Sequence, residues 1–302
     1  MTITTGSFSR DLKPVVKYFF GKAYKDHPQL YNAIFDQEKT NDAYEEYASF
    51  SGLGAAQLKT EGGSITYDSA QQLFSQNIKV LTYGLGFKVS REYIEDGKVI
   101  KFVSRKAVEF KKAELESKEV RGHLILNRAF NSSFTGADGI EMCATNHKTA
   151  SGGTYANEPA TASDLSEASL EQAVIDLRKM INNRGLRIML QPKLLIVPAE
   201  SEFLACRLLQ NKDRPGTADR DINALKYKNY LQMDPIISPY LTDTDSWFIK
   251  TDVPEGLIHL VRRDMEVESD NETDTQNANY IMTFRDAFFW NDPRAIYGSP
   301  GA

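Results

Sequence analysis

The chain has 302 residues, of which 41% are hydrophobic, 25% charged and 11% aromatic, so it can bury a substantial core, and its length favours two domains. Its 36 lysines and arginines against 41 aspartates and glutamates leave a formal charge of −5, which disfavours a dedicated reader of nucleic acid or a membrane-surface protein. Two cysteines far apart and no long apolar stretch exclude a disulfide framework and a membrane span, so we expect a soluble chain made in a reducing compartment.

Residues 1–50 are predicted to form an N-terminal arm. Short aromatic clusters, among them Tyr18 and Phe19, alternate there with charged residues, and two prolines divide the segment into short pieces. An extended arm with one or two short helices makes few contacts with itself. Its aromatic side chains are therefore expected to bury against the body of the chain or against a neighbouring subunit.

Residues 51–80 are predicted to form an extended β-hairpin loop. Small and polar residues dominate this stretch, and four glycines punctuate it: Gly52, Gly54, Gly62 and Gly63. The last two permit the positive φ angles of a tight turn, and residues 64–68 alternate with the period of a strand. Because the stretch has too little apolar content to pack a core of its own, we expect it to project from the molecule.

The next part of the chain begins with a predicted strand at 83–93 and continues into the longest helical pattern, over 98–130. Neither proline nor glycine interrupts residues 98–121, so we expect a spine helix, about 45 Å long for some thirty residues. Its charged residues are expected to form a solvated face. The stretch 136–159, rich in Gly, Thr, Ala and Ser, is predicted to be a long surface loop.

A second unit is predicted to follow. A helix is expected to start at a cap formed by Ser163 or Asp164 and to end at Gly185. A buried strand at 193–197 and a helix that opens at Pro198 come next. This succession of helix, strand and helix indicates an α/β or α+β module.

The chain after residue 210 is predicted to form a turn-rich loop and then mainly β structure. Strands are expected at 230–237, 247–250, 257–262, 265–268, 281–285 and 288–290. The acidic run from Glu266 to Asp274 is expected to be a solvated loop, because blocks of like charge are usually solvated.

The sequence carries little recognisable chemistry. The four histidines do not cluster, no nucleophile elbow or phosphate-binding loop occurs, and Gly84 and Gly86 lack the third glycine of a dinucleotide loop. Cys143 and His147 are four residues apart, but no second pair of metal-ligand residues lies nearby. We therefore expect no catalytic residue, no metal and no cofactor. An unrecognised enzyme that uses Cys143 and His147 stays open as a less favoured alternative.

The order of the predicted elements resembles that of the major capsid proteins of tailed bacteriophages, which have the Hong Kong 97-type fold. Three local stretches carry the resemblance further: 192–203, 245–249 and 294–299. The first reads Pro-Lys-Leu-Leu-Ile-Val-Pro-Ala-Glu-Ser-Glu-Phe and is similar to the strand-into-helix segment of Mu-like head subunits, and the last is similar to their closing motif. The resemblance covers essentially the whole chain and implies an α+β capsid fold.

The resemblance also implies how the chain is divided. The implied parts are an N-terminal arm at 1–50, an extended loop at 51–80, a peripheral domain at 81–162, an axial domain at 163–240, and a β-rich return to the peripheral domain at 241–302. The arm and the loop are expected to lie on neighbouring subunits. The candidate assembly residues in them are Tyr18, Phe19, Gly52, Gly54, Lys59, Gly62, Gly63 and Tyr67.

The function that the resemblance implies is that of a shell protein of the virion, assembled in the cytoplasm of a bacterial host. Copies are expected to form pentamers and hexamers of an icosahedral shell that holds double-stranded DNA, contacted weakly and without sequence preference. A separate scaffold protein, a portal and a decoration protein are the further partners expected. Lys59 is a candidate for an isopeptide crosslink, although lysines in surface loops are common. A nanocompartment shell like the encapsulins, which packages an enzyme, is the main alternative.

Overall fold

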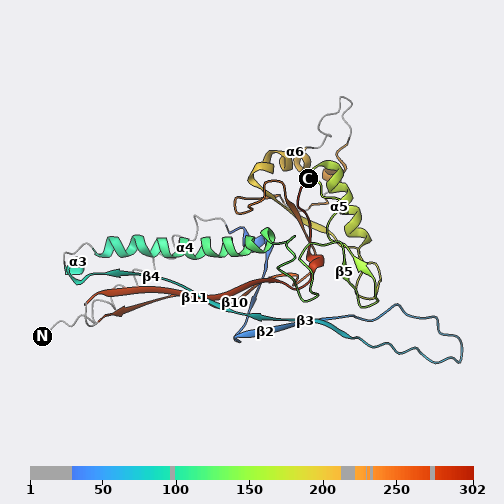
Figure 1. Ribbon diagram of the computed structural model, residues 1–302, viewed down its shortest axis with the longest axis horizontal. Helices are drawn as coiled ribbons and strands as arrows, with labels where there is room; N and C mark the ends of the chain where they lie inside the picture. Colours follow the sequence, from blue (N-terminus) through green and yellow to red (C-terminus); the bar gives the residue numbers. More distant parts are fainter. Residues whose placement is uncertain (1–28, 96–98, 212–221, 229, 232–233, 273–275) are drawn as a thin grey trace.

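The computed structural model describes residues 29–95, 99–211, 222–228, 230–231, 234–272 and 276–302. Within them, helices and strands combine around two four-stranded sheets and two short two-stranded ones. Helix α4 (Val99–Asn127) lies along one large sheet, α5 (Glu167–Lys179) and α6 (Glu202–Gln210) lie beside the other, and a hairpin extends away from both (Figure 1). The α+β class predicted from the sequence is confirmed.

The first large sheet has the strand order β1-β10-β11-β4. Its strands are β1 (Asp36–Lys39), β4 (Leu81–Val89), β10 (Leu257–Asn271) and β11 (Ala278–Trp290). β11 pairs antiparallel with β10 on one side and with β4 on the other, while β1 pairs parallel with the first part of β10 only. This sheet is therefore long and narrow, and α4 can follow it for most of its length.

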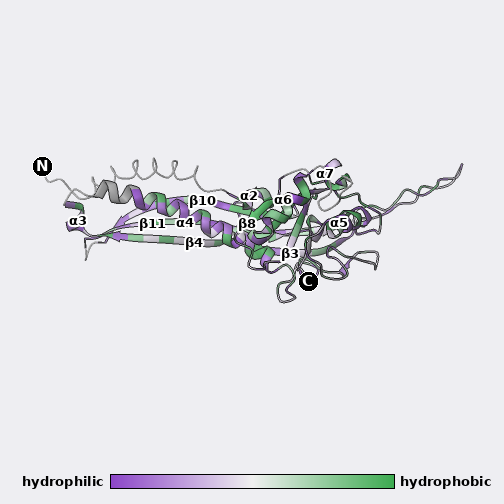
Figure 2. Cartoon of the chain, turned by 90° about the horizontal axis from the view of Figure 1, so that it is seen from above, coloured by the Kyte–Doolittle hydropathy of each residue, from purple (hydrophilic) through white to green (hydrophobic). Residues whose placement is uncertain are grey.

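The predicted spine helix is confirmed as α4 (Val99–Asn127), whose 29 residues span about 44 Å. Phe110 packs into a cluster with apolar side chains of β11 and β4. Seen from above, hydrophilic and hydrophobic residues alternate along the helix, as expected for a helix that covers a sheet (Figure 2). A Cβ atom at Gly122 would lie 3.4 Å from Tyr31 and from Phe288, so glycine lets the helix, the arm and β11 approach one another closely.

Part of the charged face of α4 is buried, contrary to the prediction of a solvated face. Glu114, Lys118 and Glu119 are all buried. Glu114 pairs with Lys111 at 2.5 Å and with Lys118 at 2.6 Å. A buried charge is tolerated when an opposite charge or a hydrogen-bond donor lies beside it. For Glu114, the two lysines three and four residues away along the helix provide the opposite charge.

Most of the acidic run that was predicted to be a solvated loop is instead part of a strand. Glu272 follows the end of that strand, and Asp274 lies outside the described residues. β10 continues to Asn271, with Glu266, Glu268 and Asp270 on an exposed face. Val267, between them in sequence, points to the other face and packs toward the cluster around α4. Successive side chains of a strand point to opposite faces, so these three carboxylates all stay in water, where their mutual repulsion is weak. The repulsion therefore does not prevent the segment from forming a strand.

Strand boundaries also differ from the prediction in this sheet. The two strands expected at 257–262 and 265–268 form one strand, β10, and those expected at 281–285 and 288–290 form β11. The pairing register shifts on both sides of Arg263, and such bulges break the alternation on which the prediction rested. The strand expected at 83–93 ends at Val89 and is followed by a short helix, α3 (Arg91–Glu95).

The second large sheet has the strand order β12-β9-β7-β8. Its strands are β7 (Pro192–Pro198), β8 (Ile236–Ser238), β9 (Trp247–Thr251) and β12 (Ile296–Ser299). Beside it lie α5 (Glu167–Lys179), α6 (Glu202–Gln210), α7 (Ala224–Tyr227) and the 3-10 turns η1 (Ala199–Ser201) and η2 (Pro293–Ala295). β9 and β12 come from the stretch 241–302, so the C-terminal part of the chain supplies strands to both large sheets.

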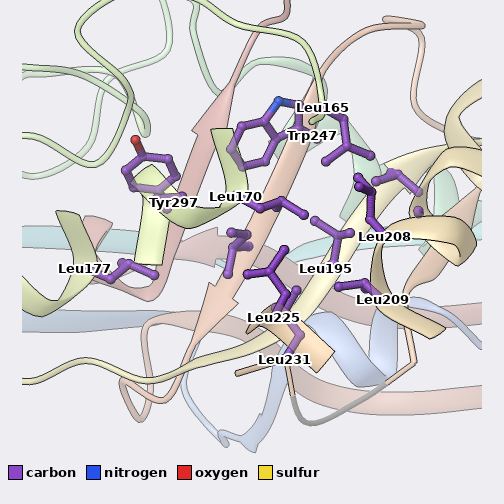
Figure 3. Packing of buried hydrophobic residues seen from close by; sticks show 14 of the residues in the cluster. Leu165, Leu170, Leu177, Leu195, Leu208, Leu209, Leu225, Leu231, Trp247 and Tyr297 are labelled. Atoms are coloured by element: carbon purple, nitrogen blue, oxygen red, sulfur yellow. The ribbon is translucent and has the colours of Figure 1, made fainter. Parts of the chain in front are cut away.

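The core of this second unit is apolar and tightly enclosed. Leucines from α5, α6 and β7 meet the rings of Trp247 and Tyr297, as Figure 3 shows. Leu170, Leu177 and Leu195 are completely buried. Truncating a fully buried leucine to alanine typically costs about 2–5 kcal/mol, so this cluster is a main source of the unit's stability.

Predictions for the second unit are confirmed for its strands and partly wrong for its helix ends. The strands expected at 193–197 and 247–250 are present as β7 and β9. The cap of α5 is Ser166, whose side chain accepts a hydrogen bond from the backbone N–H of Ser169, and not Ser163 or Asp164. The strand expected at 230–237 is reduced, among the described residues, to β8.

The projecting hairpin is formed by β2 (Tyr44–Phe50) and β3 (Gln72–Lys79), which pair antiparallel. Beyond them residues 51–71 form a long loop that extends away from both sheets (Figure 1). The predicted turn is confirmed at Gly62, whose φ is +76°. The predicted strand at 64–68 is wrong, because the described loop forms no ladder there.

The stretch 136–159, predicted to be a surface loop, buries several of its side chains, although residues 150–154 remain exposed. It contains the short strands β5 (His147–Lys148) and β6 (Thr154–Tyr155), and Met142 and Cys143 lie in a core cluster. The side chain of Asn157 donates to the carbonyl oxygens of Met142 at 2.7 Å, Pro293 at 2.9 Å and Ile296 at 3.1 Å, and accepts from the N–H of Ala144 at 2.8 Å. One buried amide therefore fastens this stretch to η2 and β12.

Candidate assembly surfaces

The 51–71 loop exposes large apolar side chains. Leu58 and Tyr67 are each 93% exposed, and Leu53 and Ile65 are more than half exposed. A monomeric protein rarely leaves so many apolar side chains together in water, and such patches mark interaction sites. The loop is therefore the first candidate surface for contact with another molecule, and Lys59 is likewise exposed on it.

The glycines predicted to matter in this loop shape its two limbs. Gly52 and Gly62 both have positive φ angles, +67° and +76°, which favour glycine. The N–H of Gly63 donates to the carbonyl oxygen of Thr60 at 3.0 Å and closes the turn. The N–H of Gly54 donates to Asp68 at 2.8 Å and holds the two limbs together nearer the base.

Arg184 joins the base of the loop to the second unit, a contact that the sequence analysis missed. Its guanidinium donates to the carboxylate of Asp68 at 3.0 Å, to the carbonyl oxygen of Gly52 at 3.3 Å, and to that of Ser69. Hydrogen bonds from the N–H groups of Gly54 and Ser69, together with the charge of Arg184, hold the pKa of Asp68 below its ordinary value. No motif marks a contact between residues 116 positions apart, so only the fold brings them together.

The end of the arm is anchored to its own chain. The short helix α2 (Tyr31–Ile34) begins where the buried carboxylate of Glu119 accepts the N–H groups of Leu30 at 2.6 Å and Tyr31 at 3.2 Å. Phe35 packs edge-on against Phe288. The candidate residues Tyr18 and Phe19 lie outside the described residues.

A buried network of charges lies beneath this anchor. Arg121 donates two hydrogen bonds to Asp286, at 2.6 and 3.0 Å, and the Nε2 atom of His259 lies 3.0 Å from the same carboxylate. Burial lowers the pKa of His259, whereas the pKa of Asp286 stays below its usual value because its two partners outweigh the effect of burial. The ring of His259 stacks on Phe288 at 4.1 Å. The network joins α4, β10 and β11 into one rigid support for the arm.

Cys143 and His147, which suggested an enzyme as an alternative, do not form a reactive pair. Cys143 is buried, and desolvation raises the pKa of its thiol well above the ordinary value, which leaves little thiolate to act as a nucleophile. His147 is also buried, with its Nδ1 atom 2.6 Å from Asp138 and its ring stacked on Tyr155. Within the described ranges, no group of three or more His, Cys, Asp or Glu side chains is placed to bind a metal ion.

None of the described helices combines the length and the apolar character that a bilayer crossing needs.

Comparison with known proteins gives these surfaces a context. The sequence profile of a family described as phage capsid protein matches residues 73–299, well over half of the chain. No curated protein matches the sequence. Three solved shells have similar folds. The procapsid of bacteriophage JBD30 is 14% identical, with a TM-score of 0.55 over 98% of this chain and 76% of its own. The virus-like particle from Pyrococcus furiosus is 11% identical, with a TM-score of 0.55 over 95% of this chain and 98% of its own. The SrpI encapsulin complex from Synechococcus elongatus is 8% identical, with a TM-score of 0.54 over 91% of this chain and 88% of its own.

Proposed function

This chain belongs to the phage capsid protein family, and we propose that it builds the head of a tailed phage as an icosahedral shell of pentamers and hexamers around double-stranded DNA. As a member of that family it is a shell protein that acts in many copies in the virion. The proposal depends on one observation, the exposed apolar side chains of the 51–71 loop. Its own chain does not cover them, so another copy of the chain is the simplest cover.

In this proposal each part of the chain has an assembly role. The arm at 1–50 and the loop at 51–80 are assigned to contacts with neighbouring subunits, except α2 and β1 of the arm, which pack on their own chain. The axial domain at 163–240 gathers around the capsomer axes. The peripheral domain at 81–162, with the return at 241–302, joins capsomers to one another. In this arrangement one surface of a subunit contacts a different surface of the next subunit. Contacts of this kind can close into rings, such as pentamers and hexamers.

The remaining expectations belong to the same proposal. The chain works without a catalytic group, is similar to Mu-like head subunits, and assembles in the bacterial cytoplasm with a separate scaffold protein, a portal and a decoration protein. DNA is held by weak contacts without sequence preference, since lysines and arginines are outnumbered by carboxylates. Lys59 is exposed on the loop and is the candidate residue for a crosslink.

The test is to express the full chain and to examine it by electron microscopy and sedimentation. Closed particles with nuclease-protected DNA, obtained with phage packaging proteins, are the expected result. Particles that contain an enzyme in place of DNA would favour a nanocompartment, the alternative suggested by the encapsulin likeness. Material that stays monomeric at every concentration and salt level would contradict the proposal.

A further inference from the structure

The first large sheet has an open edge on each of its long sides. Among the described strands, β1 covers the outer edge of β10 along Ile258–Val261 only, and β4 is the last strand on the other side. Figure 2 shows β10 and β4 along the two sides. An open strand edge offers rows of backbone N–H and C=O groups to any other strand, so proteins usually guard it with bulges or charges.

Only the edge of β10 is guarded in this way. Its pairing register shifts on both sides of Arg263, and the carboxylates from Glu266 to Asp270 are exposed along the part that β1 leaves open. The register of β4 against β11 is regular along all nine residues of the strand, and Lys88 is its single charged residue. The edge of β4 is therefore able to pair with another strand.

β4 also exposes apolar side chains. Leu81 and Leu85 are 47% and 48% exposed. Both lie on the face that packs on α4, because side chains alternate along a strand and the ring of Phe87 lies 5.0 Å from that of Phe110 on this face. On the other face two glycines leave the strand flat. A strand added beside β4 would cover the two leucines.

The residues of β4 follow a pattern that is symmetric about Leu85. Positions at equal distances on either side of it carry residues of one kind, which are glycine, aromatic, polar and aliphatic in turn. The pairs are Gly84 and Gly86, Tyr83 and Phe87, Thr82 and Lys88, and Leu81 and Val89. A strand that pairs antiparallel with a second copy of itself brings such positions opposite each other. The pattern therefore favours a second copy of β4 as the added strand.

Building on the proposed shell, we infer that β4 of one copy pairs antiparallel with β4 of a second copy across a two-fold axis at Leu85. Leu85 then faces the same residue of the second copy, and Tyr83 faces Phe87. Aromatic and aliphatic cross-strand pairs of this kind stabilise a sheet. Lys88 lies opposite Thr82, so the contact opposes no like charges.

The contact joins two four-stranded sheets into one continuous sheet, with both α4 helices on the same face. A two-fold contact closes after two copies, unlike the head-to-tail contacts that close pentamers and hexamers. In the shell it therefore links a subunit of one ring to a subunit of the next ring. It gives the peripheral domain a specific way to join capsomers.

A cysteine on the axis tests the pair directly. In Leu85→Cys the two cysteines have Cα atoms about 4.5–5.5 Å apart, within the range of a disulfide. Oxidation of assembled particles is expected to give dimers and no higher multimers on a non-reducing denaturing gel. The unmodified chain, with Cys143 and Cys206, is the control and is expected to stay monomeric. Monomer alone from Leu85→Cys, the result expected if a segment of another protein occupied the edge, would overturn the pair.

Two further positions test the direction of pairing. Thr82→Cys and Lys88→Cys, each alone, place the cysteines of the two copies about 20 Å apart, because six residues of a strand separate them. Each single variant is therefore expected to stay monomeric, and the combined variant is expected to give dimers. Dimers from either single variant would indicate parallel pairing and would overturn the two-fold contact.

Charges on the axis give an independent measurement. Leu85→Lys and Leu85→Glu each oppose like charges and are expected to lower the yield of closed particles about tenfold or more. Expression of both variants together allows mixed pairs with opposite charges, and much of the yield is expected to return. Ile281→Lys, at a residue of β11 that is 42% exposed, is the matched control and is expected to assemble normally. A mixture that assembles no better than the single variants would overturn the pair.

These experiments separate the contact from the proposed function. Normal particles that yield only monomer from Leu85→Cys would overturn the β4 pair and leave the shell function intact. Dimers from Leu85→Cys in a chain that forms no particles would support the pair and contradict the shell function.

Discussion

The loop at 51–71 and the stretch at 136–159 look alike in sequence and have opposite positions in the structure. Each contains four glycines, a Gly-Gly pair and a single tyrosine. Tyr67 in the first is 93% exposed, whereas Tyr155 in the second is 8% exposed. Glycine and small polar residues therefore do not decide whether a segment projects or is buried.

The two segments differ in the hydrogen-bond and packing partners that the rest of the chain offers them. In the 136–159 stretch, Met142 and Cys143 pack in a cluster with side chains from both large sheets. The side chain of Asn157 bonds the backbone of η2 and β12 as well as that of its own stretch. The 51–71 loop is fastened mainly at its base, through Asp68 and Arg184. The apolar side chains beyond that base have no counterpart in their own chain. In a shell protein such exposed apolar side chains are useful, because a neighbouring copy covers them when the shell assembles.

The comparison predicts its largest effect when the projecting loop is removed. Replacing residues 53–69 by a short Gly-Ser linker is expected to abolish closed shells, because the exposed apolar contact surface is lost. The unfolding temperature is expected to change by no more than about 2 °C, since nothing in the core is removed. Electron microscopy and thermal unfolding measure the two effects. A full-length variant with Leu58, Ile65 and Tyr67 changed to serine separates the loss of apolar contact from the loss of length, and normal shells from either variant would break the comparison.

The buried segment is expected to respond in the opposite way. Asn157→Ala leaves several buried backbone groups without partners, which is expected to cost about 3 kcal/mol of unfolding free energy and to lower the unfolding temperature by about 5 °C. Denaturant unfolding of the unassembled subunit measures this. Asn131→Ala, at an exposed asparagine, is the matched control and is expected to cost less than about 0.5 kcal/mol. Equal stability of the two variants would show that Asn157 does not fasten the segment.

These two segments also show what the sequence can predict. The spine helix and the strands at 193–197 and 247–250 follow from patterns that local physics fixes, and so does the turn at Gly62. The burial of 136–159 depends on carbonyl groups of Pro293 and Ile296, which lie far along the chain and leave no local signal. The acidic part of β10 was assigned wrongly for a related reason, since pairing with β11 decides its conformation. Arg184 looks like any surface arginine until the fold places it beside Asp68.

A smaller effect is expected from loosening the base of the loop. Arg184→Ala removes the contact with Asp68 and two carbonyl oxygens but no apolar packing, so global stability is expected to fall by less than about 1 kcal/mol. Hydrogen exchange within 51–71 is expected to become up to about fivefold faster, and shells to form more slowly because the loop is less well directed. Arg187→Ala, at an exposed arginine nearby, is the control. Unchanged exchange in the Arg184 variant would mean that the loop is held by other contacts.

The smallest effect is a dependence on pH that is confined to the loop. The hydrogen bonds from Gly54 and Ser69 and the charge of Arg184 lower the pKa of Asp68, so the folded loop favours the carboxylate. The ionised carboxylate of Asp68 stabilises the base of the loop. This stabilisation is complete above the ordinary aspartate pKa of about 3.9 and is lost as the pH falls through the lowered pKa of Asp68. Protection of the Gly54 N–H against exchange, corrected for intrinsic rates, is therefore expected to stay constant from pH 7 to pH 5 and to fall only in stronger acid. Asp68→Asn is expected to remove that step. A loss of protection already between pH 7 and pH 5 would assign it to another titrating group, and Asp68 would then not be what joins the limbs of the loop.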